Sequence, residues 1–355
     1  MPERVAIVGS GLAALAAYAT LRHRGVPIGD ITVFGTHADP TEVWHGRAKA
    51  IRQSRMRSES EGHLAAASWP GLALRDRDPR AWLATTANRY HPPVDLFIRH
   101  AQRVTARSGW EQSFCAQRVE RIAAVDGGFE LDGEGPFRHV LVATGHPGLA
   151  RPVPGSVHAY EPHEYAKQVT IVGAGMAAAH EWLNALAAGS EVVSVRRREP
   201  TRRPLNVPRP LLTKRGLDAY HASSAEEHAA TLRTLSQPSY PPGVKWDEPL
   251  RAAEREGRFR VASEVNGAEQ VICATGFLEG FAHDPLLARL VQEHELPTHD
   301  RWIVLASDST VAALTNGRTL SVAGIAGQWA FPAADTIAGA KYAARAFTRR
   351  VCRTR

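Results

Sequence analysis

Short runs of four or five hydrophobic residues recur along the chain between longer segments of mixed character. Two of these runs lead into a Gly-x-Gly-x-x-Ala turn and then into an alanine-rich stretch, at Val5–Tyr18 and Val169–Trp182. A short apolar run is typical of a buried strand, and an alanine-rich run is typical of a helix. The pattern predicts strand, helix and strand twice: Arg4–Val8, Leu12–Arg24 and Asp30–Phe34, then Val169–Val172, Met176–Ala188 and Glu191–Val195.

The segments after these two units also repeat one order. Each contains a predicted strand pair and then an Ala-Thr-Gly element, at 143–145 and again at 274–276. Residues Thr319–Phe347 predict a strand, a loop and a closing helix that returns to the first domain. The other predicted elements are helices at Arg80–Arg89, Val94–Ser108 and Ala225–Leu235, and strands at Gln117–Val125, Gly128–Leu131, His139–Val142, Phe259–Ser263 and Gln270–Cys273.

The two glycine turns indicate nucleotide binding. The first glycine permits the tight bend, the second lets the backbone approach a pyrophosphate, and the small third residue lets helix and strand pack closely. Free N–H groups and the positive end of the helix dipole then hold the phosphates. The residues at these places are Gly9, Gly11 and Ala14 in the first unit, and Gly173, Gly175 and Ala178 in the second. Two turns predict two dinucleotides with electron transfer between them.

The second unit carries a further signal at the end of its second strand. Val195 is followed by Arg196, Arg197 and Arg198. An acidic residue there would repel a 2′-phosphate, whereas an arginine fork binds it through charge-assisted hydrogen bonds. We therefore expect NADPH rather than NADH, with a solvated run of arginines as the alternative interpretation.

Composition and charge exclude several classes of protein. The chain is 44% hydrophobic and 22% charged, as expected for a globular protein, and no apolar run reaches the length of a membrane span. The net charge is +7, but the 38 arginines are spread along the chain, so nucleic acid is not an expected partner. With no secretory signal visible, we expect a cytoplasmic protein. The three cysteines form neither a Cys-x-x-Cys motif nor a set with zinc spacing, so we expect no local redox dithiol and no metal.

The paired glycine motifs, each followed later by Ala-Thr-Gly, resemble the two-dinucleotide-binding flavoprotein superfamily. Ala-Thr-Gly-Phe at 274–277 is similar to an element of flavin-containing monooxygenases and amine N-hydroxylases, and residues 155–175 resemble their link to the second motif. The resemblance implies FAD in the first unit and NADPH or NADH in the second. It also implies cofactor contacts from the Ala-Thr-Gly elements and the C-terminal strand, at Thr144, Gly145, Thr275, Gly276 and Gly324.

One departure from this superfamily concerns the adenosine ribose of FAD. An acidic residue usually closes the second strand of the FAD unit, but this chain has Phe34-Gly35-Thr36 there, and Asp39 is the nearest acid. Ribose binding through Asp39 or Thr36 is the resulting expectation. The C-terminal strand also lacks the usual Gly-Asp pair, and Asp335 is interpreted as a helix cap or structural residue.

The expected fold is α/β with two Rossmann-like dinucleotide-binding domains. Residues 1–150 plus 277–355 form the FAD-binding domain, and residues 160–276 form an inserted NAD(P)H-binding domain. In the resembling enzymes the region of Trp44–His63 lies against the flavin ring, so Arg55, Arg57, Ser58 and His63 are candidate donors to the flavin, and Arg55, Ser58 and His63 are the candidate catalytic residues. An ordinary polar surface loop is the alternative, and the lone residues His146 and His158 are interpreted as structural.

These expectations converge on an FAD-dependent, NADPH-consuming oxidoreductase. The favoured activity is oxygenation of a small organic substrate by O2 through a peroxyflavin. The alternative is a flavin reductase that acts on a quinone, ferredoxin or other acceptor without a redox-active dithiol, and a nucleotide-binding sensor without turnover is a third hypothesis. A homodimer is compatible with each of them.

Overall fold

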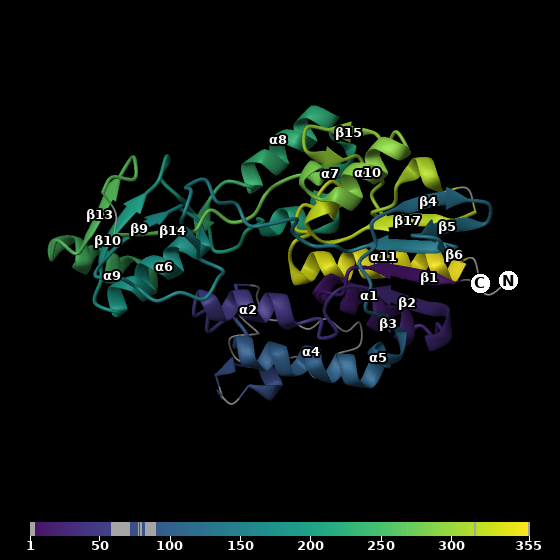
Figure 1. The fold of residues 1–355 in the computed structure, drawn as a ribbon, viewed down its shortest axis with the longest axis horizontal. Helices are drawn as coiled ribbons and strands as arrows, with labels where there is room; N and C mark the ends of the chain where they lie inside the picture. Colours follow the sequence, from purple (N-terminus) through teal and green to yellow (C-terminus); the bar gives the residue numbers. More distant parts are fainter. Residues whose placement is uncertain are drawn as a thin grey trace.

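The structure is a computed structural model that describes residues 4–57, 72–76, 78, 80–81, 90–267, 269–315 and 317–353. Figure 1 shows two α/β bodies placed along the long axis of the molecule, one around β1 and one around β9. The candidates Ser58 and His63 lie outside the described residues, as does most of the helix expected at Arg80–Arg89.

The first body is built on a parallel five-stranded sheet in the order β17-β7-β1-β2-β3. In the pairing register, Val8 lies beside Phe34 and Val142, and Val142 lies beside Val322. The carboxyl ends of four strands therefore meet at one edge of the sheet, which is where ligands bind in open α/β sheets. The strands are β1 (Val5–Val8), β2 (Ile31–Phe34), β3 (Phe114–Cys115), β7 (His139–Val142) and β17 (Thr319–Val322).

The second body repeats this design with the order β13-β10-β9-β14-β8, again with all strands parallel. Here the ends of β9 and β14 lie side by side, with Val172 paired to Cys273. The two sheets confirm the predicted α/β fold with two Rossmann-like units. The strands are β8 (Val157–His158), β9 (Gln168–Val172), β10 (Glu191–Val195), β13 (Phe259–Ala262) and β14 (Gln270–Cys273).

Smaller elements complete the two bodies. An antiparallel sheet consists of β4 (Ile122–Val125), β5 (Gly128–Leu131) and β6 (Glu134–Phe137), and two strand pairs are β11 (Thr201–Arg202) with β12 (Ser239–Tyr240) and β15 (Thr298–His299) with β16 (Trp302–Ile303). The helices are α1 (Leu12–His23), α2 (Glu42–Ala50), α4 (Val94–Ser108), α5 (Trp110–Ser113), α6 (Met176–Ala187), α7 (Lys214–Ala222), α8 (Ala225–Leu235), α9 (Val244–Arg255), α10 (Pro285–Glu293) and α11 (Ile337–Arg353).

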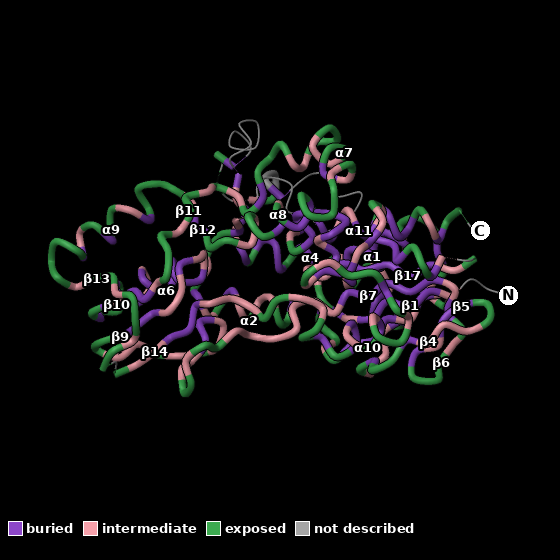
Figure 2. Tube along the Cα trace, turned by 90° about the horizontal axis from the view of Figure 1, so that it is seen from above, coloured by how far each residue is buried: buried purple, intermediate pink, exposed green. Residues whose placement is uncertain are grey.

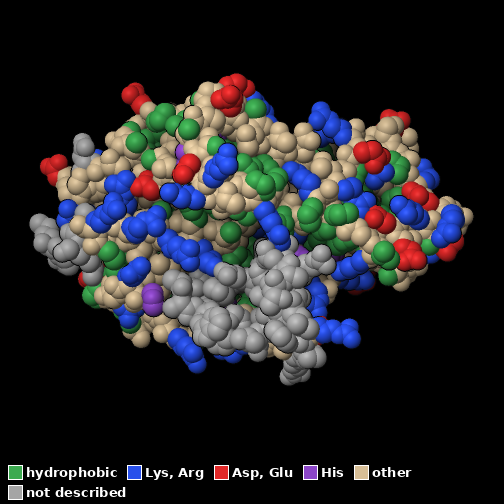
Figure 3. All heavy atoms as spheres, turned by 180° about the vertical axis from the view of Figure 1, so that it is seen from behind, with side chains coloured by type: hydrophobic (Ala, Val, Ile, Leu, Met, Phe, Trp, Pro, Cys, Tyr) green, Lys and Arg blue, Asp and Glu red, His purple; other side chains and the backbone are tan. Residues whose placement is uncertain are grey.

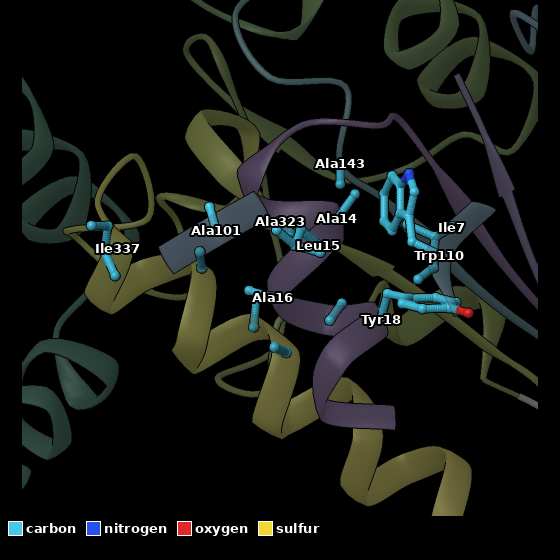
Figure 4. Packing of buried hydrophobic residues seen from close by; sticks show 14 of the residues in the cluster. Ile7, Ala14, Leu15, Ala16, Tyr18, Ala101, Trp110, Ala143, Ala323 and Ile337 are labelled. Carbon is cyan, nitrogen blue, oxygen red and sulfur yellow. The ribbon is translucent and has the colours of Figure 1, made fainter. Parts of the chain in front are cut away.

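Helix α1 packs closely on α11 because both helices present small side chains. Ala16 and Ala17 of α1 are fully buried, as is Ala344 of α11. Figure 4 shows α1 crossing α11 near Ala16, with Tyr18 of α1 beside Trp110. Since β17 joins the first sheet and α11 covers it, the C-terminal segment returns to the first body, as the sequence predicts.

The segment that contains α7 and α8 packs with the first body. Tyr220, Ala229 and Leu232 share a core with Val142 of β7 and with residues near β16, although they fall within the range expected for the inserted domain. Val207 likewise packs against the loop before α11. The expected domain boundaries stay a prediction. In this segment, residues expected to belong to the inserted domain pack in the core of the first body.

The distribution of buried and exposed residues follows from this arrangement of the two sheets. Buried stretches gather around the two sheets, while the turns at the outer edge of the second body, next to α9 and β13, are exposed (Figure 2). Lys and Arg side chains are spread over the face in Figure 3. No helix among the described residues has the length and hydropathy needed to cross a bilayer, and those residues hold no cluster of three potential metal-binding side chains.

Candidate functional site

The first glycine turn leaves a bare helix N-terminus at the edge of the sheet. Gly9 has φ +109°, and a Cβ there would lie 2.2 Å from the carbonyl oxygen of Ala143, so only glycine fits. Gly11 precedes α1 without any side-chain cap, and the space where its Cβ would project is open for 4 Å. Ala14 is fully buried between helix and sheet. The first turns of α1 therefore offer unpaired N–H groups to an anion.

The second turn reproduces this geometry. Gly173 has φ +136°, and its Cβ would lie 2.4 Å from the carbonyl oxygen of Ala274. Gly175 precedes α6 uncapped and with open space, and Ala178 is fully buried. Each first glycine also donates to the end of the neighbouring strand, from Gly9 to Phe34 at 2.8 Å and from Gly173 to Val195 at 3.0 Å.

A cavity of about 830 Å³ opens over the first turn. This volume lies near the upper end of the usual range for ligand sites, about 300–1,000 Å³. The cavity runs from the turn along the ends of β2, β7 and β17 to α2 and to the N-terminus of α11. Gly145 and Gly324, both with positive φ, face each other on its wall, where a Cβ on Gly324 would lie 3.9 Å from the Cα of Gly145. A dinucleotide fits this shape and this bare helix end.

The two Ala-Thr-Gly elements anchor the crossings between the bodies. The Thr144 hydroxyl donates to Asp284 at 2.6 Å, and the other oxygen of that buried carboxylate caps α10 by accepting from the backbone N–H groups of its first turn. The Thr275 hydroxyl donates to the carbonyl oxygen of Ala150, while the Ala150 N–H donates to Gly276 at 3.1 Å. Both hydroxyls are thus engaged within the protein, and their role as cofactor contacts stays a prediction.

Gly35, at the place of the usual ribose-binding acid, packs against Ser10. A Cβ on Gly35 would lie 2.3 Å from the Ser10 hydroxyl oxygen, so a larger residue after β2 has no room. Asp39 lines the cavity, but its Oδ1 already accepts from the backbone N–H and hydroxyl of Thr41, at 2.8 and 2.7 Å. Its second carboxylate oxygen is the one left for a ligand.

Arg196 and Arg197 follow β10 at the corresponding place of the second unit. Arg196 pairs with exposed Glu199 at 2.9 Å and lies over the Trp182 ring at 5.7 Å, and its buried Nε has no partner among the described residues. Arg197 is exposed. One guanidinium is therefore fixed and the other is free to turn, and their role in phosphate binding stays a prediction.

Two of the predicted flavin-ring candidates, Arg55 and Arg57, are described, and Arg55 does not line the cavity. Its guanidinium is exposed and donates to the carbonyl oxygen of His91 at 2.9 Å. Its neighbour Arg57 does line the cavity. Local sequence places both arginines in one polar loop, and only the tertiary fold separates their roles.

Arg57 connects the first body to the segment between β11 and β12. Its guanidinium donates to Arg203 at 2.8 Å, to the Ser239 carbonyl and hydroxyl oxygens at 3.3 Å, to Pro204 at 3.4 Å, and to the Asn206 side chain. Burial and, to a lesser extent, the charge of Arg203 lower the pKa of Arg57 to about 10, while Asp335 opposes this shift. Arg57 therefore stays charged at neutral pH and holds a wall of the cavity in place.

Asp335 is a cavity residue rather than the cap of α11. Its side chain is exposed to the cavity, although the carboxyl group lies deep in the molecule. That burial raises the pKa of Asp335, and the charge of Arg57 partly offsets it. The cap of α11 is Thr336, whose hydroxyl accepts from the Gly339 N–H at 3.2 Å. Arg47, Asn206 and Asp335 are among the cavity residues that motif spacing did not reveal.

None of the three cysteines lines the cavity. Cys115 ends the edge strand β3, Cys273 is buried at the end of β14, and Cys352 is exposed near the end of α11. All three are free thiols.

Comparison with known families identifies this architecture. The profile described as pyridine nucleotide-disulphide oxidoreductase matches residues 3–206, more than half of the chain. The protein belongs to this family. The predicted superfamily of FAD- and NAD(P)-binding oxidoreductases is thereby confirmed, and no curated protein matches the sequence.

Solved structures share the fold of the whole chain at low sequence identity. An ornithine hydroxylase from Pseudomonas aeruginosa has a TM-score of 0.71 at 16% identity, and an ornithine N-hydroxylase from Kutzneria sp. 744 has a TM-score of 0.75 at 15% identity. A bacillithiol disulfide reductase from Bacillus cereus has a TM-score of 0.59 at 15% identity. Each alignment covers 99% of both chains.

Proposed function

We propose that this protein is an FAD-dependent monooxygenase that consumes NADPH and O2 and oxygenates a small organic substrate. The observation that carries the proposal is the cavity of about 830 Å³ over the first glycine turn, which has no cysteine in its described lining, in a chain with a second turn of the same geometry. A reductase of disulfides requires a thiol beside the flavin, and the described lining offers none.

The structural relatives support both cofactors. The Kutzneria enzyme was solved with reduced FAD, NADP⁺ and L-ornithine, and it aligns with nearly the full length of this chain. In this chain the open space at Gly11 and the uncapped N-terminus of α1 suit the pyrophosphate of FAD. The corresponding groups at Gly175 suit the pyrophosphate of NADPH, and Arg196 and Arg197 suit its 2′-phosphate.

The chain's own residues would bind and orient rather than react. FAD supplies the redox chemistry by accepting a hydride from NADPH and passing the electrons to O2. Gly145 and Gly324 let the backbone approach the cofactor, and Arg57 fixes the wall that faces it. Asp335, whose pKa is raised by burial, is the carboxyl group best placed to hold a proton in this cavity.

Stopped-flow oxidation tests the proposal. The FAD-loaded protein is reduced with NADPH without oxygen, then mixed with O2 and candidate substrates such as L-ornithine, and the flavin absorbance, free H2O2 and oxygenated product are followed. Reoxidation over seconds with product and little H2O2 supports a monooxygenase. Immediate reoxidation that releases all electrons as H2O2, with every substrate, contradicts it and favours a reductase. A protein that takes up no FAD contradicts both.

We also propose a cytoplasmic location, because an exposed free thiol at Cys352 suits a reducing compartment. The homodimer compatible with the sequence is tested by sedimentation of the purified protein.

A further inference from the structure

An aromatic stack lies where the chain crosses between the two bodies. His146 follows the first Ala-Thr-Gly element and Phe277 follows the second, and their rings stack at 3.8 Å between centroids and 17° between planes. Tyr160 stacks against the same Phe277 ring at 5.2 Å and 13°. An isolated bridge between Leu149 and Phe277 joins the two crossing strands. The stack therefore fixes the His146 ring at the junction of the two nucleotide units.

His146 has hydrogen-bonding capacity that the protein does not use. It lines the cavity, and neither ring nitrogen has a partner among the described residues, with Nδ1 buried. His158, on the other side of the same crossing, is different. Its Nε2 bonds to the Gly276 carbonyl oxygen at 2.9 Å, and its Nδ1 accepts from the Tyr160 N–H at 3.1 Å. Buried polar groups are normally satisfied, so the free capacity of His146 points to a ligand.

The charge state of His146 limits which ligand group it can bind. Burial, with the nearby charge of Arg47, lowers the pKa of His146 to about 4. Arg47 itself lies over the Phe277 ring at 4.7 Å. A neutral imidazole has one donor and one acceptor nitrogen, which suits an uncharged amide and not a phosphate.

The nicotinamide carboxamide is the group with this chemistry that must reach the junction. On the proposed function, the second glycine turn holds the NADPH pyrophosphate while the flavin lies in the first body's cavity, so the nicotinamide has to extend toward that cavity. We propose that His146 binds the nicotinamide half of NADPH through a hydrogen bond between its imidazole and the carboxamide. This inference rests on the proposed cofactors and assigns a binding role to His146, which sequence alone presents as structural.

Binding measurements on the FAD-loaded protein test this assignment. His146→Phe keeps a ring to stack on Phe277 but removes both nitrogens. We expect it to weaken NADP⁺ binding roughly three- to tenfold, as the loss of one hydrogen bond would. Binding of adenosine 2′,5′-bisphosphate, which lacks the nicotinamide half, should not change. His146→Gln, which places an amide near Nε2, should recover part of the NADP⁺ affinity.

His158→Phe is the matched control, since it alters a satisfied histidine at the same crossing. It should lower the thermal midpoint while leaving the ratio of the two affinities as in the wild type. Equal affinities of wild type and His146→Phe for NADP⁺, or equal weakening of both ligands, overturn the assignment. A wild-type protein that binds neither ligand overturns the NADPH proposal with it, so the two failures are distinguishable.

Discussion

The two glycine turns have the same backbone geometry, but the helices that follow them are buried in different ways. Ala16 and Ala17 of α1 correspond in sequence to His180 and Glu181 of α6, and all four are buried. Alanines suit α1 because α11 lies directly on it. The motif thus sets the turn, while the element packed on each helix sets the residues that follow.

The covering of α6 adds polar contacts to an apolar core, and part of it comes from the first body. Glu181 bonds to His163 at 2.8 Å and accepts from the Tyr165 hydroxyl at 3.0 Å. The Asn184 side chain donates to the carbonyl oxygen of Ile51, next to α2, at 2.9 Å. Helix α6 is therefore held by polar bonds in addition to the apolar packing around Trp182, whereas α1 is held by close apolar packing.

The largest expected effect comes from substituting the first glycine of each motif separately and measuring the binding of each cofactor. Gly9→Ala and Gly173→Ala place a Cβ 2.2 and 2.4 Å from a carbonyl oxygen, at φ values that alanine rarely adopts. We expect Gly9→Ala to weaken FAD binding about 100-fold or more, because the turn must open. Gly173→Ala should retain FAD and lose NADP⁺ binding to a similar degree. Flavin absorbance after dialysis and NADP⁺ calorimetry measure the two effects.

Ala substitutions at open positions provide the control for the glycine variants. Gly29→Ala, at a glycine with open space, without positive φ and away from both turns, should leave both cofactor affinities close to wild type. If Gly173→Ala releases FAD as readily as Gly9→Ala does, the two sites are not independent.

The next largest effect should come from breaking the link between the two regions. Arg57→Ala removes a half-buried guanidinium that bonds across to residues 203–239. We expect a loss of about 1–3 kcal/mol in the free energy of unfolding, because the part-buried acceptors on Arg203 and Ser239 lose a charged donor. Arg55→Ala, with an exposed side chain in the same loop, should cost less than about 0.5 kcal/mol. Urea unfolding followed by tryptophan fluorescence tests this, and equal losses for the two variants would contradict the bridging role.

Arg57 also shows where prediction from sequence ends. Local patterns predicted the bounds of α8 correctly, since Ser224 and Glu227 form a capping box before an apolar stripe. The same patterns missed α9, whose Pro249 reads as a helix breaker although Trp246, Leu250 and Ala253 bury one face. A helical period identifies the buried face but not its partner.

The candidate site also has a part that local sequence predicts and a part that depends on contacts between distant residues. The glycine turns were predictable because each needs residues that are adjacent in sequence. The contacts of the cavity wall were not, because the candidate Arg57 meets partners 146 to 182 residues away, and Asp335 enters the site only through the path of the loop before α11.

A smaller effect on cofactor affinity should come from the arginines that follow β10, where the second unit is expected to bind the 2′-phosphate of NADPH. The double variant Arg196→Ala with Arg197→Ala removes two of the three arginines that follow β10 and leaves Arg198 in place. We expect NADP⁺ affinity to fall about tenfold, through lost charge-assisted hydrogen bonds, while NAD⁺ affinity changes little. FAD affinity is the internal control, since the first unit is untouched. A parallel loss for NADP⁺ and NAD⁺ would mean that the arginines support the fold and do not read the 2′-phosphate.

The smallest predicted effect is on the pH dependence of stability and concerns His180 of α6, which stands where α1 has Ala16. Burial, with the charge of Lys245, lowers the pKa of His180 to about 4. The unfolded chain takes up this proton near pH 6.5 and the folded protein near pH 4, so His180 costs stability as the pH falls between these values. His180→Ala restores the residue found at Ala16, and it should remove part of this acid sensitivity. At neutral pH the variant should be less stable, because the imidazole packs on Trp246 at 5.1 Å.

The measurement is urea unfolding of wild type and His180→Ala from pH 7 to pH 4. The stability gap between them should narrow steadily as the pH falls, since only the wild type loses the contribution of the neutral imidazole. His146 and His228, whose pKa values are also lowered to about 4, titrate in both proteins and cancel in the difference. A gap that stays constant over this range would show that His180 is protonated in the folded protein, and the contrast between the coverings of α1 and α6 would then rest on Glu181 alone.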